Sequence, residues 1–145
     1  MSTESVKVTD AAFHESKLQH IAHFGIRLAL GVIFIVHGIG KLDPMFGGFL
    51  SQIGLPSEMQ IPIALAEIVP GMLVMCGVLS RISSSLLSIV LLGAIFYVKK
   101  ASGLTGQTGV ELELILLAAN LAVIVTGPGK ISVSHLAKKL PRFLH

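Results

Sequence analysis

The fold is decided by the first long apolar run of the chain, Ile21–Leu42, which reads IAHFGIRLALGVIFIVHGIGKL. This run is too long for a buried strand, and it lacks the alternation of polar and apolar residues that strands show. A helix rises about 1.5 Å per residue, so a run of this length can cross a hydrocarbon core of about 30 Å. The run therefore predicts a membrane-spanning helix that carries Arg27, His37 and Lys41 within it.

Three further apolar runs follow, at about 59–79, 82–98 and 109–127. Ser57 and Gln60 have the spacing of a helix-capping box, which predicts the start of the second helix. Leu79–Arg81 is a short turn, so the second and third helices are expected to form an antiparallel hairpin. The sequence predicts an all-α integral membrane four-helix bundle over 21–129, preceded by a segment over 1–20 and followed by a tail over 130–145.

Composition agrees with a membrane protein. Hydrophobic residues make up 52% of the 145 residues, charged residues only 13%, and the mean hydropathy is +0.82. This excludes a disordered chain and argues against a soluble domain, which has about 25% charged residues. The net charge of +3 is too sparsely spread for a nucleic-acid surface. Cys76 is the single cysteine, which excludes an internal disulfide and a cysteine zinc cluster.

The lysine and arginine residues predict the orientation in the membrane. If four helices span it, both termini lie on one side with Lys7, Lys17, Arg27, Arg81, Lys130, Lys138, Lys139 and Arg142. Only Lys41, Lys99 and Lys100 lie on the other side. The prediction is a multi-pass protein of the cell membrane with both termini cytoplasmic. Its basic C-terminal tail is either an amphipathic surface helix or a solvated topology anchor.

Polar residues fall on one stripe of three of the predicted helices. In the first helix the stripe contains Arg27, Gly31, Phe34, Gly38 and Lys41, and His37 lies beside it. In the second helix the stripe contains Glu67, Pro70, Val74, Gly77 and Arg81. In the fourth helix, Glu113 and Asn120 share a face. The glycines are expected to let helices approach closely. The predicted topology brings His37, Lys41, Glu67, Lys99, Lys100, Glu111 and Glu113 into the outer half of the membrane.

Charges inside a membrane are costly and need an explanation. In one interpretation, Arg27, His37 and Glu67 are polar links that hold the bundle together. In a second, they line a pocket where Glu67 exchanges protons with a quinone or a small anion. A metal site made by His37 and three glutamates is a third interpretation, although no paired ligand spacing supports it. Lys99, Lys100 and Glu111 are interpreted as interface residues outside the site.

Several motifs together resemble the DoxX family. They are RxxxGxxFxxHGxxKL over Arg27–Leu42, GLP at Gly54–Pro56, ExxxG at Glu67–Gly71, GxxxR at Gly77–Arg81 and GxGxxS at Gly127–Ser132. The resemblance covers about Phe24 to Ser134 and implies a small four-helix membrane protein. The family usually has an aspartate where this chain has Ser134, so a role that needs a carboxylate there is not carried over.

The resemblance also implies a function, because the family takes its name from a thiosulfate:quinone oxidoreductase. We expect the membrane subunit of a redox complex that handles quinone or a small sulfur anion at the outer face, and leave open whether the chain itself is an enzyme. His37 and Glu67 are the expected catalytic pair, Lys41 and Glu113 the expected substrate contacts, and Arg27, Arg81 and Asn120 structural polar residues. No metal and no covalently bound cofactor is expected.

Two other functions stay open at this point. The chain is alternatively a non-catalytic scaffold subunit or a small-molecule transporter, although the lack of inverted-repeat symmetry argues mildly against transport. The expected partners are the lipid bilayer and other membrane or redox subunits, and a homo-oligomer is compatible with the sequence.

Overall fold

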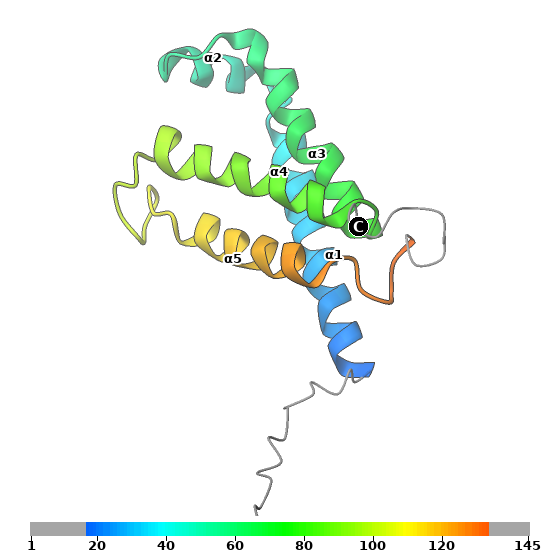
Figure 1. Cartoon of the computed structure of the whole chain (residues 1–145). Coiled ribbons are helices and arrows are strands. Elements are labelled where there is room, and N and C mark those ends of the chain that lie inside the picture. The colour runs from blue at the N-terminus through cyan, green and yellow to red at the C-terminus, as the bar shows by residue number, and fades with distance from the viewer. Residues whose placement is uncertain (1–16, 134–145) are drawn as a thin grey trace, which may run out of the picture.

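The computed structural model describes residues 17–133, and within this range the chain is helical and contains no strand (Figure 1). The elements are α1 (Lys17–Gly40), α2 (Pro44–Gln52), the 3-10 turn η1 (Ser57–Met59), α3 (Gln60–Cys76), α4 (Ser80–Gly93), the π-helical turn η2 (Ala94–Val98) and α5 (Glu111–Thr126). The N-terminal segment before residue 17 and the predicted amphipathic tail, with Ser134, lie outside the described residues.

The long helices form two pairs. Figure 1 shows α1 beside α3 and α4 beside α5, with the second pair inclined to the first, and α3 also packs against α4. The short helix α2 lies at the end of the bundle where α1 ends and α3 begins. This arrangement leaves space between α2, α3 and α4, where the candidate site described below is found.

Glycines allow α1 and α3 to pack closely, as the sequence predicted. A Cβ atom on Gly31 would lie 2.6 Å from Met75 Cβ and 2.7 Å from the Gly71 carbonyl oxygen. A Cβ on Gly38 would lie 2.9 Å from the Ala64 carbonyl oxygen. Any larger residue at Gly31 or Gly38 would therefore push the two helices apart.

The outer surface of the bundle is apolar. The buried core contains Leu30, Phe34, Val74, Leu87, Leu91, Leu116 and Val123. Outward-facing residues are equally apolar, and Ile89, Ile115 and Val125 are each more than half exposed. An apolar surface on both the inside and the outside of helices is typical of a protein whose solvent is lipid.

Within residues 17–133, three helical segments are long and apolar enough to span a membrane: Lys17–Gly40, Ser57–Cys76 and Ser80–Val98. These segments confirm the helices predicted from the first three runs. The fourth run also forms a helix, α5, but its 16 residues give a length of only about 24 Å. The fourth membrane span and the orientation of the termini stay predictions.

The structure corrects three local predictions. The expected capping box is wrong: Ser57 makes no side-chain cap, and the side-chain amide of Gln60 donates instead to the carbonyls of Lys41 (3.0 Å) and Asp43 (2.7 Å). The second helix ends at Cys76, earlier than expected, because Gly77 adopts a left-handed conformation with φ of 74°. The helix α2 and the π-helical turn η2 were not predicted.

Candidate functional site

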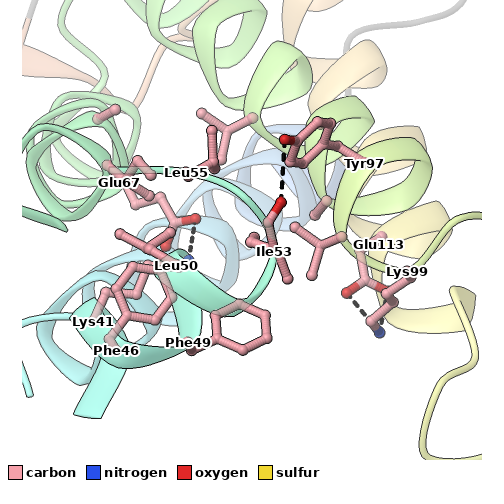
Figure 2. Close-up of a pocket in the computed structure, with 16 residues that line it drawn as sticks. Lys41, Phe46, Phe49, Leu50, Ile53, Leu55, Glu67, Tyr97, Lys99 and Glu113 are labelled. Atoms are coloured by element: carbon pink, nitrogen blue, oxygen red, sulfur yellow. Dashed lines mark hydrogen bonds and ion pairs between the residues drawn. The ribbon is translucent and has the colours of Figure 1, made fainter. Parts of the chain in front are cut away.

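A cavity of about 460 Å³ lies between α2, α3 and the α4–η2 segment (Figure 2). Its walls are mostly apolar. One wall comes from α2 and the loop after it, through Phe46, Phe49, Leu50, Ile53 and Leu55; the others come from Ile63, Ala66, Val90, Gly93, Ala94, Tyr97 and Val98. Two ion pairs, Lys41–Glu67 and Lys99–Glu113, also line it.

The helix α2 forms because the residues before it favour a helix start. The Asp43 side chain accepts a hydrogen bond from the Met45 N–H at 2.8 Å, and Pro44 occupies the first helical position. The apolar side of α2 faces the cavity, where the rings of Phe46 and Phe49 stack with centroids 5.8 Å apart. The Tyr97 hydroxyl donates to the Ile53 carbonyl at 3.2 Å, which connects the end of α2 to η2 across the cavity (Figure 2).

The first ion pair joins α1's end to α3. The Lys41 ammonium donates to Glu67 Oε1, and the Glu67 side chain is only 5% exposed. Glu67 Oε2 is buried and has no hydrogen-bond partner among the described residues. Pro70 lacks an N–H, so the Ala66 carbonyl loses its helical partner one residue from Glu67. This spot is therefore polar within an otherwise apolar helix.

The second ion pair joins the end of η2 to α5. Lys99 Nζ lies 2.8 Å from Glu113 Oε1 and donates to the Gly109 carbonyl at 2.6 Å. The π-helical turn Ala94–Val98 changes the helical register just before Lys99. Lys99, which the sequence interpretation left outside the site, lines the cavity and holds Glu113.

His37 lies on a second, smaller cavity of about 60 Å³, which Lys41, Glu67 and Glu113 also line. The structure thus brings together the four residues that the sequence placed in the site. The ion-pair partner of Glu67 is Lys41 rather than His37, and the His37 residue is exposed. A direct pair between His37 and Glu67 is accordingly not formed in this structure.

The three residues expected to be structural lie elsewhere. Arg27 is fully buried and donates to the carbonyls of Val74 and Ile131, while Asn120 is fully buried and donates to the Leu116 carbonyl at 3.0 Å. Arg81 is exposed near the start of α4. Within residues 17–133, no group of three or more His, Cys, Asp or Glu side chains is placed to hold a metal ion.

Sequence reasoning missed the apolar part of the site. Residues of α2 form one wall of the larger cavity, and their sequence, PMFGGFLSQ, carries a signal that could have found them. An aspartate followed by proline predicts a helix start, and two phenylalanines three residues apart lie on one helical face. The contribution of η2 had no comparable signal.

Comparisons with known proteins agree with the motifs. The DoxX family model matches residues 22–100, from α1 to just beyond η2. A Bacillus subtilis (strain 168) protein named "Putative oxidoreductase CatD" is 38% identical over 104 residues, covering 70% of this chain and 76% of the relative. A Mycobacterium tuberculosis (strain H37Rv) protein named "Uncharacterized membrane protein Rv3486" is 31% identical over 130 residues, covering 79% and 80%. No solved structure matches the chain.

Proposed function

The chain belongs to the DoxX family, and from this premise we propose that it is the membrane subunit of a redox complex and binds a quinone in the larger cavity. The observation that carries the proposal is an apolar cavity of about 460 Å³ with a lysine–glutamate pair at two places on its wall. A relative of this chain is named as an oxidoreductase, which supports a redox role.

The residues of the cavity fit a quinone by size and by chemistry. Small-molecule sites commonly measure about 300–1,000 Å³ and combine apolar walls with a few polar groups. In Figure 2, Lys41 with Glu67 and Lys99 with Glu113 lie on opposite sides of the cavity, and the apolar residues of α2 lie between them. A quinone has an apolar ring and two carbonyl oxygens, so Lys41 and Lys99 would each donate to one oxygen.

Each residue has a defined task in this proposal. Glu67 and Glu113 hold the two ammonium groups in position, and Phe46 and Phe49 pack against the ring. A bound quinone supplies reversible two-electron, two-proton chemistry. Glu67 exchanges the protons, because its Oε2 has no other hydrogen-bond partner among the described residues, and a partner subunit supplies or removes the electrons.

The cavity supports a quinone better than a small sulfur anion. Most of its wall is apolar, and both lysines that line it are already paired with carboxylates. An anion bound to either lysine would lie beside the carboxylate of Glu67 or Glu113, and repulsion between the like charges costs electrostatic energy. If both termini are cytoplasmic, as the sequence predicts, the proposed quinone site lies near the outer face of the membrane.

One experiment tests the proposal directly. The full-length protein is purified from its native membrane in mild detergent, and mass spectrometry identifies the bound proteins, lipids and quinones. We expect co-purified redox subunits and a quinone at a stoichiometry that falls when Lys41 and Lys99 are both replaced by methionine. Recovery of a lone protein without quinone would contradict the proposal.

A scaffold role is a second candidate, because both ion pairs also join separate helical elements. The two candidates predict opposite results for Glu67→Gln. A scaffold subunit with this substitution gives less assembled complex but the same turnover per complex. A quinone-binding subunit gives a lower turnover in the complexes that do assemble.

A further inference from the structure

We propose that the smaller cavity holds water and conducts protons between Glu67 and His37, so that His37 is the point at which protons from the larger cavity reach solvent. The inference rests on the proposed function only for the identity of the molecule that exchanges protons with Glu67. The proton route itself follows from the geometry of the described residues.

The two cavities share part of their walls. Lys41, Glu67 and Glu113 line both of them, whereas His37 lines only the smaller one. A cavity that holds a water molecule needs a volume of about 10–15 Å³ and two to four polar partners for the water. The smaller cavity, with about 60 Å³ and four polar side chains on its wall, has room for a short chain of water molecules.

Glu67 supplies the observation that points to water. Its residue is only 4% exposed, its Oε1 is paired with Lys41, and its Oε2 is buried with no hydrogen-bond partner among the described residues. A buried carboxylate oxygen without a hydrogen bond is costly. Water in the smaller cavity would donate to Oε2 and remove this cost.

Four charged or titratable side chains face the smaller cavity. They are His37 from α1, Lys41 just after α1, Glu67 from α3 and Glu113 from α5. Each carboxylate is paired with a lysine, Glu67 with Lys41 and Glu113 with Lys99, so the Oε2 atom of Glu67, without a hydrogen-bond partner among the described residues, is the atom that can accept a proton. His37 is exposed close to the end of α1, and an imidazole can take a proton at one ring nitrogen and release one from the other.

The transfer involves only protons. The O–H bond of protonated Glu67 breaks and its proton joins a water molecule, while a proton of that water chain passes to one ring nitrogen of His37. The other ring nitrogen of His37 releases a proton to solvent, and Glu67 returns to its carboxylate form. No electron moves in these steps, and the reverse sequence delivers a proton to Glu67.

The experiment uses the full-length protein in lipid nanodiscs with no added quinone. Infrared spectroscopy follows the carboxylic-acid band of Glu67, assigned by its loss in Glu67→Gln, as an acidic step protonates it and D₂O exchanges it. In His37→Gln we expect exchange to be slower by about tenfold or more, the size of contribution that a positioned proton-transfer group makes. Imidazole in the buffer should restore the rate, and His20→Gln on the same helix should leave it unchanged.

A second pair of variants tests the water directly. Leu112 lines the smaller cavity but not the larger one, and Leu114 lines neither; both lie in α5 and are 41% exposed. Leu112→Phe should fill the cavity and slow the exchange of Glu67, whereas Leu114→Phe should not. Equal exchange rates in wild type, His37→Gln and Leu112→Phe would overturn the proposal, as would the absence of a Glu67 acid band after the acidic step.

The experiments distinguish a failure of the proton route from a failure of the proposed quinone binding. If the exchange depends on His37 but the protein binds no quinone, the proton route stands and the quinone proposal fails. If quinone binds but exchange is independent of His37, the proton route is wrong and the quinone proposal stands.

Discussion

At the scale of single residues, the energetics centre on Glu67. A carboxylate that is 5% exposed at its side chain is stable only with a partner, and Lys41 provides it. Lys41 is 23% exposed, so its own charge is partly screened by solvent. The pair therefore holds the end of α1 to α3, and Glu67 Oε2, which has no hydrogen-bond partner among residues 17–133, leaves one polar atom for chemistry.

The ion pair predicts a non-additive effect on stability. Glu67→Leu and Lys41→Met should each lower the free energy of unfolding by about 1–3 kcal/mol, because each leaves its partner unpaired in an apolar wall. The double variant Lys41→Met/Glu67→Leu should be more stable than either single variant. Thermal unfolding in detergent micelles measures this, with Glu111→Gln as an exposed control. A double variant whose loss equals the sum of the two single losses would contradict the pairing.

The sequence predicted the polar members of the site because a charge inside an apolar run requires an explanation. His37, Lys41, Glu67 and Glu113 all line the same small cavity, as expected from their positions along the helices. The partners were harder to predict. Lys41 and His37 lie close together on the first helix, so helical spacing could not decide which one Glu67 contacts. Lys99 was interpreted as an interface residue because it lies at the outer end of its run, and its contact with Glu113 depends on packing that the sequence does not reveal.

At the scale of helices, the close packing of α1 and α3 positions the Lys41–Glu67 pair. Gly31, Gly38 and Gly71 form the contact, and their backbone atoms lie too close for side chains between the helices. The length and hydrophobicity of the runs predicted three of these helices well. The short helix α2 was not predicted, and two adjacent glycines lower the helix propensity of its sequence, PMFGGFLSQ.

The helix contact predicts different results for two glycines of α1. Gly31→Ala places a Cβ 2.6 Å from Met75 Cβ and should cost about 1–3 kcal/mol of stability through overpacking. Gly25→Ala meets nothing within 4 Å and should raise stability by up to about 1 kcal/mol through helix propensity. The melting temperatures of the two purified variants, compared with that of the wild type, test this prediction. Similar shifts for both would mean that α1 and α3 do not pack closely in the membrane.

The hydrogen bond between Tyr97 and Ile53 predicts how firmly α2 covers the cavity. Tyr97→Phe removes a bond of 3.2 Å, which is worth about 0.5–1.5 kcal/mol. Hydrogen–deuterium exchange of the α2 amides should therefore become about threefold to tenfold faster. Phe96→Leu, at an exposed position next to Tyr97, is the control. Unchanged exchange in Tyr97→Phe would show that α2 is held by its apolar contacts alone.

At the scale of the whole molecule, the orientation of the chain in the membrane decides which side the site faces. Arg27 and Gly77 lie together at one end of the bundle, and both ion pairs lie at the other end, where α1 ends and α5 begins. If both termini are cytoplasmic, the cavities open toward the outer face. The loops of this chain are short, which is the condition under which lysine and arginine counts predict orientation best.

The orientation predicts the behaviour of fused reporters. A reporter that is active only in the cytoplasm should be active when fused to the C-terminus, and it should be inactive when inserted in the loop between η2 and α5, at Gly106. The opposite pattern would place the cavities on the cytoplasmic side. Activity at both positions would mean that α5 does not span the membrane.

The measurement that tests the account most directly is the binding of a decyl-substituted 1,4-benzoquinone to the protein in nanodiscs. Gly93 lines the larger cavity, and a Cβ there meets nothing within 4 Å, so Gly93→Leu is expected to take up part of the cavity. Gly25→Leu adds the same side chain to α1 outside the cavity and is the matched control. We predict saturable binding in wild type and Gly25→Leu, and binding at least about tenfold weaker in Gly93→Leu, a loss of about 1.4 kcal/mol or more. Equal affinity in all three proteins would contradict the assignment of the cavity as a quinone site.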